Sequence, residues 1–306
     1  MHRIPPESEP ASEPFSPLRA AALGLYCAVT QPIRRHLAAV QSYSGQSRVM
    51  SFFYHRVAAM TDSPWTAPIV TFQRQIEWLR ARYELVSLSE SLRRIRFGNT
   101  RPSVHITFDD GYADNCSLAL PYLVATRVPV TYFVATQHIL SGKPFQHDAR
   151  LGNPLPVNTP QQIRAMADAG IEIGSHTRHH VDLGQITDAA TLHDEIVGSK
   201  HELEDMLGRS VRYFSFPYGL PKQMTPAAVQ LLREAGYEAI CSAFGGYNFP
   251  GNDPFHVQRI HGDNEMARFK NWATMDPRKL RVQFPLPIDA LEAQIHATST
   301  PRVPGR

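Results

Sequence analysis

The segment 104–111, VHITFDDG, joins a β-strand pattern directly to two adjacent carboxylates, Asp109 and Asp110. A second segment, HTRHH at 176–180, carries His176 and His180 four positions apart. One carboxylate and two histidines can occupy three positions around a divalent metal ion. The second carboxylate is then free to act as a base on water. Together the two segments predict a site for metal-assisted hydrolysis.

The composition sets wide limits on the protein class. The chain has 306 residues and 42% hydrophobic residues, enough for one large domain or two smaller ones. The formal net charge of +3 predicts no nucleic-acid partner. The three cysteines, Cys27, Cys116 and Cys241, are far apart and form no C-x-x-C pair. This pattern favours reduced thiols over a disulfide framework.

Strand and helix patterns alternate along most of the chain. Strands are expected over 49–54, 85–88, 104–108, 130–135, 171–173, 211–216, 239–241 and 257–260. Helices are expected over 71–83, from 89 onward, over 115–126 with a bend at Pro121, over 160–169, over 191–207 and over 226–235. Such alternation predicts a parallel sheet, either closed or open.

The ends of the expected strands favour a closed barrel. Polar or turn residues follow directly after four different strands: His55, then Asp109 and Asp110, then His176, then Pro217 and Tyr218. In α/β barrels the carboxyl ends of the strands meet at one face, where the active site lies. We therefore expect these residues to converge on one cavity.

Each motif has a simpler explanation when taken alone. Asp110-Gly111 is a common turn pair, and 176–180 could be a polar loop. Their shared position after apolar strands favours a metal site, because clustered His and Asp are costly to bury unpaired. No G-x-S-x-G, P-loop or G-x-G-x-x-G motif occurs.

A non-haem iron oxygenase also uses two His and one carboxylate, but it leaves Asp109 without a role and usually has an all-β barrel.

The chain resembles the polysaccharide deacetylases, carbohydrate esterase family four, also called the NodB homology domain. TFDDG at 107–111 is similar to the first motif of that family, His176-Thr177-x-x-His180 to the second, and FPYG at 216–219 to the end of the third. The resemblance covers about 48–280. It implies a distorted (β/α) barrel, expected to have seven strands, and a hydrolase that removes acetyl groups, chiefly N-acetyl. The substrate would be an amino-sugar polysaccharide, an oligosaccharide or a lipid-linked precursor.

The resemblance also implies roles for individual residues. Asp109 would be the general base, and Asp110, His176 and His180 would bind the metal. The backbone N–H of Tyr218 would help to hold the oxyanion, and Pro217 and Tyr218 would border the acetyl pocket. Zn²⁺ is the expected ion, although Co²⁺, Ni²⁺ or Mn²⁺ could serve. His179 is not expected to be a ligand, because it faces away from the i, i+4 pair.

Two departures from the family pattern leave alternatives open. Ser215 stands where the third motif often has an Arg that pairs with the base; Arg259 is a candidate replacement, or else a surface residue. The C-terminal segment lacks a clear leucine-x-histidine motif, so the general acid is His55 or His261. Exopolysaccharide deacetylases of this broad family look similar at Tyr54-His55, which points to exopolysaccharide biosynthesis. A sugar-binding protein that kept the fold and lost turnover is the alternative function.

We expect three parts: a leader and helix over 1–47, a catalytic domain over 48–282 and a tail over 283–306. Residues 1–17 are rich in Pro, Glu and Ser and are expected to be disordered. The apolar run 20–29 is too short to span a bilayer, and no signal peptide is expected. The helix either packs on the domain or makes peripheral membrane contact through 18–40, beside the basic cluster 34–36. These features favour a cytoplasmic protein, with the inner face of the membrane as an alternative location; they contain no signal for the oligomeric state.

Overall fold

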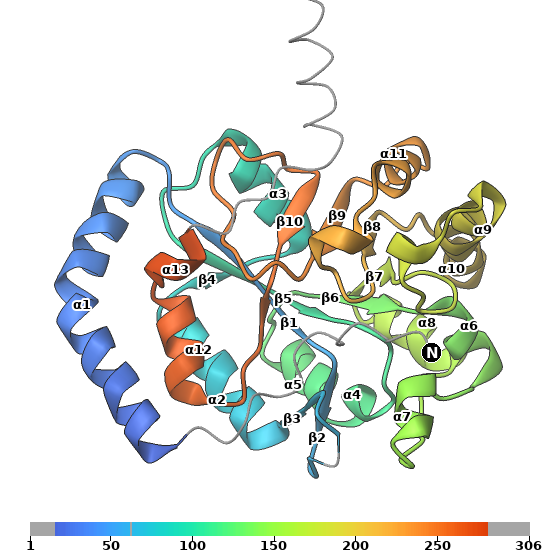
Figure 1. The fold of residues 1–306 in the computed structure, drawn as a ribbon, viewed down its shortest axis with the longest axis horizontal. Helices are drawn as coiled ribbons and strands as arrows, with labels where there is room; N and C mark the ends of the chain where they lie inside the picture. Colours follow the sequence, from blue (N-terminus) through green and yellow to red (C-terminus); the bar gives the residue numbers. More distant parts are fainter. Residues whose placement is uncertain (1–15, 62, 281–306) are drawn as a thin grey trace, which may run out of the picture.

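Parallel strands form a sheet that curls into a nearly closed barrel with helices around it (Figure 1). The computed structural model describes residues 16–61 and 63–280. The strand order is β10-β9-β8-β7-β6-β5-β1-β11, and β4 pairs with β5 beside this path. The strands are β1 (Val49–Tyr54), β4 (Glu84–Leu85), β5 (Ser103–Phe108), β6 (Val130–Val134), β7 (Glu172–Ser175), β8 (Tyr213–Ser215), β9 (Ala239–Ser242), β10 (His256–Gln258) and β11 (Ile260–His261), and a separate pair joins β2 (Arg56–Ala58) to β3 (Thr66–Pro68). The barrel predicted from the strand ends is confirmed.

The barrel is completed at Arg259. Strands β10 and β11 are separated by this one residue, yet β10 pairs with β9 and β11 pairs with β1, at opposite ends of the path. The chain therefore crosses from one end of the sheet to the other at Arg259. Seven strands were expected, and the path has eight named strands because the last expected strand, 257–260, is divided there.

Helices connect the strands and cover the barrel. They are α1 (Pro17–Tyr43), α2 (Ile69–Arg80), α3 (Leu88–Phe97), α4 (Asp114–Ser117), α5 (Ala119–Ala125), α6 (Thr136–Ser141), α7 (Gln146–Arg150), α8 (Pro160–Asp168), α9 (Ala189–His193), α10 (Ser199–Leu207), α11 (Pro226–Glu234), α12 (Met266–Ala273) and α13 (Pro277–Leu280), with short segments η1 (Leu183–Gln185), η2 (Asp194–Gly198) and η3 (Pro221–Gln223). Helix α8 starts and stops where its sequence predicts. Thr159 accepts from the backbone N–H of Gln162 in a capping box, and Gly170 beyond the helix has φ +88°.

Two helices differ from expectation. The expected bend at Pro121 is wrong: the break lies at Leu118, between α4 and α5. Pro121 sits in the first turn of α5, where a helix needs no N–H from it. The helix expected over 191–207 is interrupted by the π-helical segment η2 between α9 and α10. This interruption matters for the site, because it carries Glu195.

The core lies inside the barrel and between the barrel and its helices. Every residue of β1, β5 and β6 is buried, because one face of each strand fills the interior and the other meets a helix. Helix α2 buries Phe72, Ile76 and Leu79, the face that its spacing predicts. Packed side chains on both faces of these strands thus hold the strand ends in place.

The first and last segments are only partly described. Helix α1 packs along α12 at the outside of the molecule (Figure 1). The expected disordered leader falls largely on 1–15 and the expected tail on 283–306, outside the described residues. Among the described helices, none combines the length and the apolar character needed to cross a bilayer. The three cysteines are free, with Cys241 buried.

Candidate active site

The predicted residues from four strand ends meet at one small cavity of about 40 Å³. Its lining includes residues that the sequence singled out: His55 after β1, Asp109 and Asp110 after β5, His176 and His180 after β7, and Tyr218 after β8. Pro217 is buried and is not among the lining residues; its neighbour Phe216 is. The cavity has room for about three water molecules, since each needs roughly 10–15 Å³.

Left-handed backbone separates the two adjacent carboxylates. Asp110 has φ +77° and Gly111 has φ +106°, so the chain turns sharply after β5. At Gly111 a Cβ atom would lie 2.9 Å from Ile139 Cδ1, which explains the glycine. The turn sends Asp109 toward Arg259 and Asp110 toward the two histidines. Neighbours in sequence thus have different partners.

Arg259 holds Asp109 with both arms of its guanidinium. Nη1 donates to Asp109 Oδ1 at 2.7 Å and Nη2 donates to Oδ2 at 2.8 Å, and the Arg259 side chain is only 1% exposed. Nη2 also donates to Ser215 Oγ at 2.8 Å. Burial acts to raise the pKa of Asp109, but the charge of Arg259 opposes it and the net pKa is lowered. Arg259 is therefore no surface residue, and it contacts the carboxylate that the Arg missing at Ser215 was expected to contact.

Asp110, His176 and His180 form a cluster that fits a metal ion. Their ligand atoms lie within 4.8 Å of one another, with His176 Nε2 at 3.4 Å and His180 Nε2 at 3.2 Å from Asp110 Oδ1. His176 Nδ1 lies 2.8 Å from the carbonyl of Ser215, so the neutral ring donates there and presents a lone pair at Nε2. Asp110 Oδ1 is buried without a hydrogen-bond partner. A divalent cation bound between these three atoms would supply the positive charge that such a group of buried acceptors lacks.

The loop that carries both histidines is fixed by Glu195. Thr177 and His180 have φ +65° and +56°, so the loop needs external support. Glu195 Oε2 accepts from the backbone N–H of Arg178 at 3.0 Å and of His179 at 2.9 Å, and Oε1 lies 2.6 Å from His179 Nδ1. The π-helical turn η2 places this carboxylate, as such turns often do at functional sites. His179 itself lies outside the metal cluster.

The two candidate acids occupy different places. His55 lines the cavity, and its Nδ1 is buried without a hydrogen-bond partner. His261 lies behind it, with ring centroids 6.0 Å apart, and is not among the lining residues. Burial lowers the pKa of both rings, to about 3 for His261; Asp110 and Asp109 act to raise the pKa of His55, but the net direction is still downward. Its position at the cavity favours His55.

Four lining residues escaped the sequence analysis: Phe53, Trp65, His147 and Ala243. Trp65 precedes β3 and His147 lies on α7, so neither follows a barrel strand. Trp65 contacts the rings of His55 and His147, with centroids 5.5 and 6.2 Å away. His147 Nε2 lies 3.0 Å from the hydroxyl of Tyr112. Only the packing of loops over the strand ends brings these rings to the cavity.

Comparisons with known proteins point to one family. A family model described as polysaccharide deacetylase matches residues 98–240. Residues 98–240, which carry all three motifs, belong to this family. The chain is 30% identical over 120 residues, 39% of this chain and 47% of that protein, to a chitooligosaccharide deacetylase of Bradyrhizobium sp. (strain ANU 289). It is 24% identical over 220 residues, 68% of this chain and 72% of that protein, to a poly-beta-1,6-N-acetyl-D-glucosamine N-deacetylase of Staphylococcus epidermidis.

Solved structures of the family share the fold. IcaB from Ammonifex degensii superposes with a TM-score of 0.65 at 22% identity, over 75% of this chain and 98% of that one. The matches to three of the curated relatives span 45% to 61% of those proteins' lengths. The family assignment thus rests on the motif-bearing part of the barrel.

Proposed function

We propose that this chain is a metal-dependent hydrolase that removes acetyl groups, chiefly N-acetyl, from an amino-sugar polysaccharide, oligosaccharide or lipid-linked precursor. One observation carries the proposal: an ionised Asp109, held by Arg259, lies directly beside the Asp110, His176 and His180 cluster. The names of relatives support the substrate class, since they include deacetylases of chitooligosaccharides and of poly-N-acetylglucosamine. A place in exopolysaccharide biosynthesis is part of this proposal.

The residues divide the work of hydrolysis as follows. A divalent ion held by Asp110, His176 and His180 would supply Lewis acidity toward the acetyl carbonyl and the attacking water. Zn²⁺ is our proposed ion, with Co²⁺, Ni²⁺ or Mn²⁺ as substitutes. Asp109 takes the proton from water, and Arg259 keeps its carboxylate ionised and oriented. His55 gives a proton to the departing nitrogen, and the backbone of Tyr218 faces the developing negative charge.

The rival functions fit less well. A non-haem iron oxygenase has no use for the buried Arg259–Asp109 pair, and the parallel barrel is not its usual all-β setting. A sugar-binding protein without turnover would not need a base whose ionisation an arginine maintains. Such a protein would bind metal and sugar without releasing acetate.

Acetate release tests the proposal. We expect the metal-loaded protein to release acetate from at least one of three substrates: chitooligosaccharides, poly-N-acetylglucosamine fragments and lipid-linked N-acetylglucosamine. A chelator should abolish the release, and added Zn²⁺, Co²⁺, Ni²⁺ or Mn²⁺ should restore it. The matched control is Asp109→Asn, which keeps all three proposed ligands. Binding of metal and sugar with no acetate from any substrate would identify the sugar-binding alternative. The predicted cytoplasmic location stays a prediction that cell fractionation checks.

A further inference from the structure

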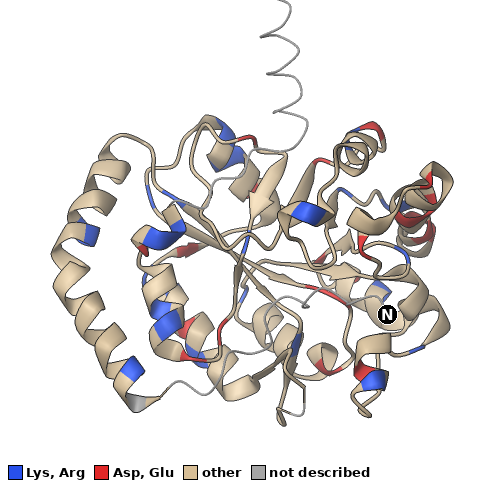
Figure 2. Ribbon diagram, in the orientation of Figure 1, with Lys and Arg blue, Asp and Glu red and all other residues tan. Residues whose placement is uncertain are grey.

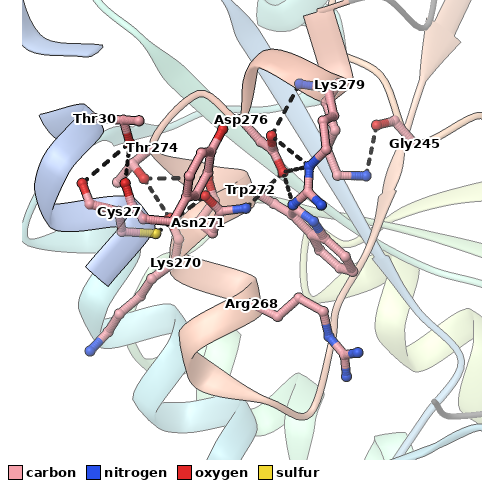
Figure 3. Close-up of polar contacts among 12 residues, drawn as sticks. Cys27, Thr30, Gly245, Arg268, Lys270, Asn271, Trp272, Thr274, Asp276 and Lys279 are labelled. Atoms are coloured by element: carbon pink, nitrogen blue, oxygen red, sulfur yellow. Dashed lines mark hydrogen bonds and ion pairs between the residues drawn. The ribbon is translucent and has the colours of Figure 1, made fainter. Parts of the chain in front are cut away.

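Helix α1 is attached to the domain by a polar face. Arg34 is 4% exposed and donates to Asn271 Oδ1 at 2.8 Å and to Thr274 Oγ1 at 3.2 Å. Cys27 Sγ lies 3.3 Å from the same Asn271 oxygen. Figure 3 shows Cys27 and Thr30 of α1 beside Asn271 of α12 and Thr274, the residue that follows this helix. The side of α1 that meets the domain therefore uses hydrogen bonds where most surface helices bury apolar side chains.

The outward face of α1 is apolar. Leu18, Leu25, Val29, Ile33 and Val40 are 80%, 67%, 68%, 64% and 50% exposed. Their spacings of seven and four residues place them on one side of the helix, over about 33 Å of its length. Eight of the fourteen large apolar side chains found exposed in the described chain lie on α1. The five residues named here, the outer stripe, form an apolar surface larger than scattered exposure explains.

Cations border the outer stripe, and acids are absent from the helix. Residues 17–43 contain no Asp or Glu, and Figure 2 shows no acidic colour along α1. Arg19 and Arg35 are exposed, on either side of the stripe. Arg19 and Tyr26 also line an open groove with Arg278 of α13. The groove borders the outer stripe, because its lining residue Ala22 lies about one turn from Leu18 on the same side of the helix. An exposed apolar stripe with cations along its edges is typical of helices that lie in the interface of an anionic membrane.

A second copy of the chain fits this face poorly. Pro32 and His36 interrupt the outer stripe where a helix pair would need apolar side chains. Association through α1 would also bring the cationic edges of two copies together, with no acid on either helix to pair with them. A surface of negative phosphates above an apolar layer satisfies both the arginines and the stripe.

We propose that α1 docks this protein on the surface of an anionic lipid bilayer. The outer stripe enters the boundary between headgroups and acyl chains, and Arg19 and Arg35 face lipid phosphates. The helix lies along the membrane and does not cross it. The proposal stands independently of the deacetylase activity, because no residue of the cavity takes part.

Sedimentation with vesicles tests the stripe. The full chain should bind phosphatidylcholine vesicles that contain phosphatidylglycerol more tightly than pure phosphatidylcholine vesicles. The triple change Leu25→Ser, Val29→Ser, Ile33→Ser should weaken binding to the mixed vesicles by at least about tenfold, because it removes most of the inserted apolar surface. The matched control is Val70→Ser with Val124→Ser, two side chains 61% and 42% exposed on other helices. Metal content and circular dichroism check that each variant is folded.

A second pair of variants tests the charges. Arg19→Gln with Arg35→Gln should weaken binding to the mixed vesicles by roughly 30-fold, the factor that about 1 kcal/mol for each cation implies, and should change binding to pure phosphatidylcholine little. Arg101→Gln, at a side chain 77% exposed elsewhere, is the control. Absence of binding by the unaltered chain would overturn the proposal, as would equal binding by the triple serine variant. So would a dimer in light scattering that the serine changes dissociate, since it would assign the stripe to a second copy.

Discussion

Arg259 and Asp109 are 150 positions apart in the sequence and form a two-armed ion pair inside the barrel, with N–O distances of 2.7 and 2.8 Å. Asp109 follows β5, and Arg259 separates β10 from β11 where the two ends of the sheet approach each other. The residue that completes the barrel is thus also the residue that orients the proposed base. The chain thus crosses between the two ends of the sheet at the same residue whose side chain pairs with Asp109.

Replacing Arg259 should impair the base and leave the metal in place. Arg259→Lys keeps a charge but loses the planar fork, and we expect kcat to fall by on the order of 10²-fold. Arg259→Gln should also move the acidic limb of the kcat/KM profile to higher pH. The pKa of Asp109 should rise in this variant, because burial raises it and the opposing charge of Arg259 is gone. Ser215→Ala removes a hydroxyl that donates to Asp109 Oδ2 at 3.4 Å and accepts from Arg259 at 2.8 Å, but it keeps the charge of Arg259 and should move that limb less. An unchanged profile in Arg259→Gln would contradict the role of Arg259.

The two adjacent carboxylates should respond differently to the same change. Asp109→Asn should keep the metal and lose activity by about 10² to 10⁴-fold, because a general base is lost. Asp110→Asn should lose both metal and activity, since Asp110 supplies one of three ligand atoms. Elemental analysis and acetate release on the same samples check this. Near-normal turnover by Asp109→Asn would exclude it as the base.

The histidine pair should be essential for metal uptake. His176→Ala and His180→Ala should each carry little metal, because a three-ligand site is left with two ligands. His179→Ala is the control from the same loop, since its ring contacts Glu195 and lies outside the cluster. Full metal occupancy in both ligand variants would overturn the assignment.

Glu195 should act as a positioning residue for the metal. Glu195→Gln keeps one acceptor for the two backbone N–H groups of Arg178 and His179 but loses the charge and the contact with the His179 ring. We expect weaker metal affinity, by about 10- to 100-fold as for other outer-shell partners, with kcat largely retained at saturating metal. Competition with a chelator measures the affinity. Glu204→Gln, a change on the neighbouring α10, should leave it unaltered.

The effect of removing His55 should depend on whether the leaving group needs a proton. His55→Ala should retain metal and slow the hydrolysis of an acetamide, whose nitrogen departs only when protonated. An activated aryl acetate, whose leaving group needs no proton, should be affected much less. His261→Ala should have little effect on either substrate, because His261 does not line the cavity. Equal losses on both substrates would show that His55 is not the acid, and a loss confined to His261→Ala would transfer the role.

Much of the fold could be predicted because its signals are local. The buried strand 104–108 and the capped start of α8 depend on neighbouring residues alone, and both appear where expected. The convergence of Asp109, His176 and Tyr218 also follows from the sequence, because parallel strands of a barrel all end at the same face. Local patterns were less reliable where several breaks were equally acceptable, as at Leu118.

The remaining features depend on contacts between distant segments. The local sequence around Arg259 allowed a surface residue as readily as a buried partner, and only the closure of the sheet placed it against Asp109. Trp65, His147 and Glu195 reach the site through loops and a π-helical turn, which follow no simple periodicity. The sequence by itself determined the barrel and the motif residues, since short-range pattern and strand direction specify both. Tertiary structure alone decided which side chain orients the base, because burial and pairing of charges arise only when the chain has closed on itself.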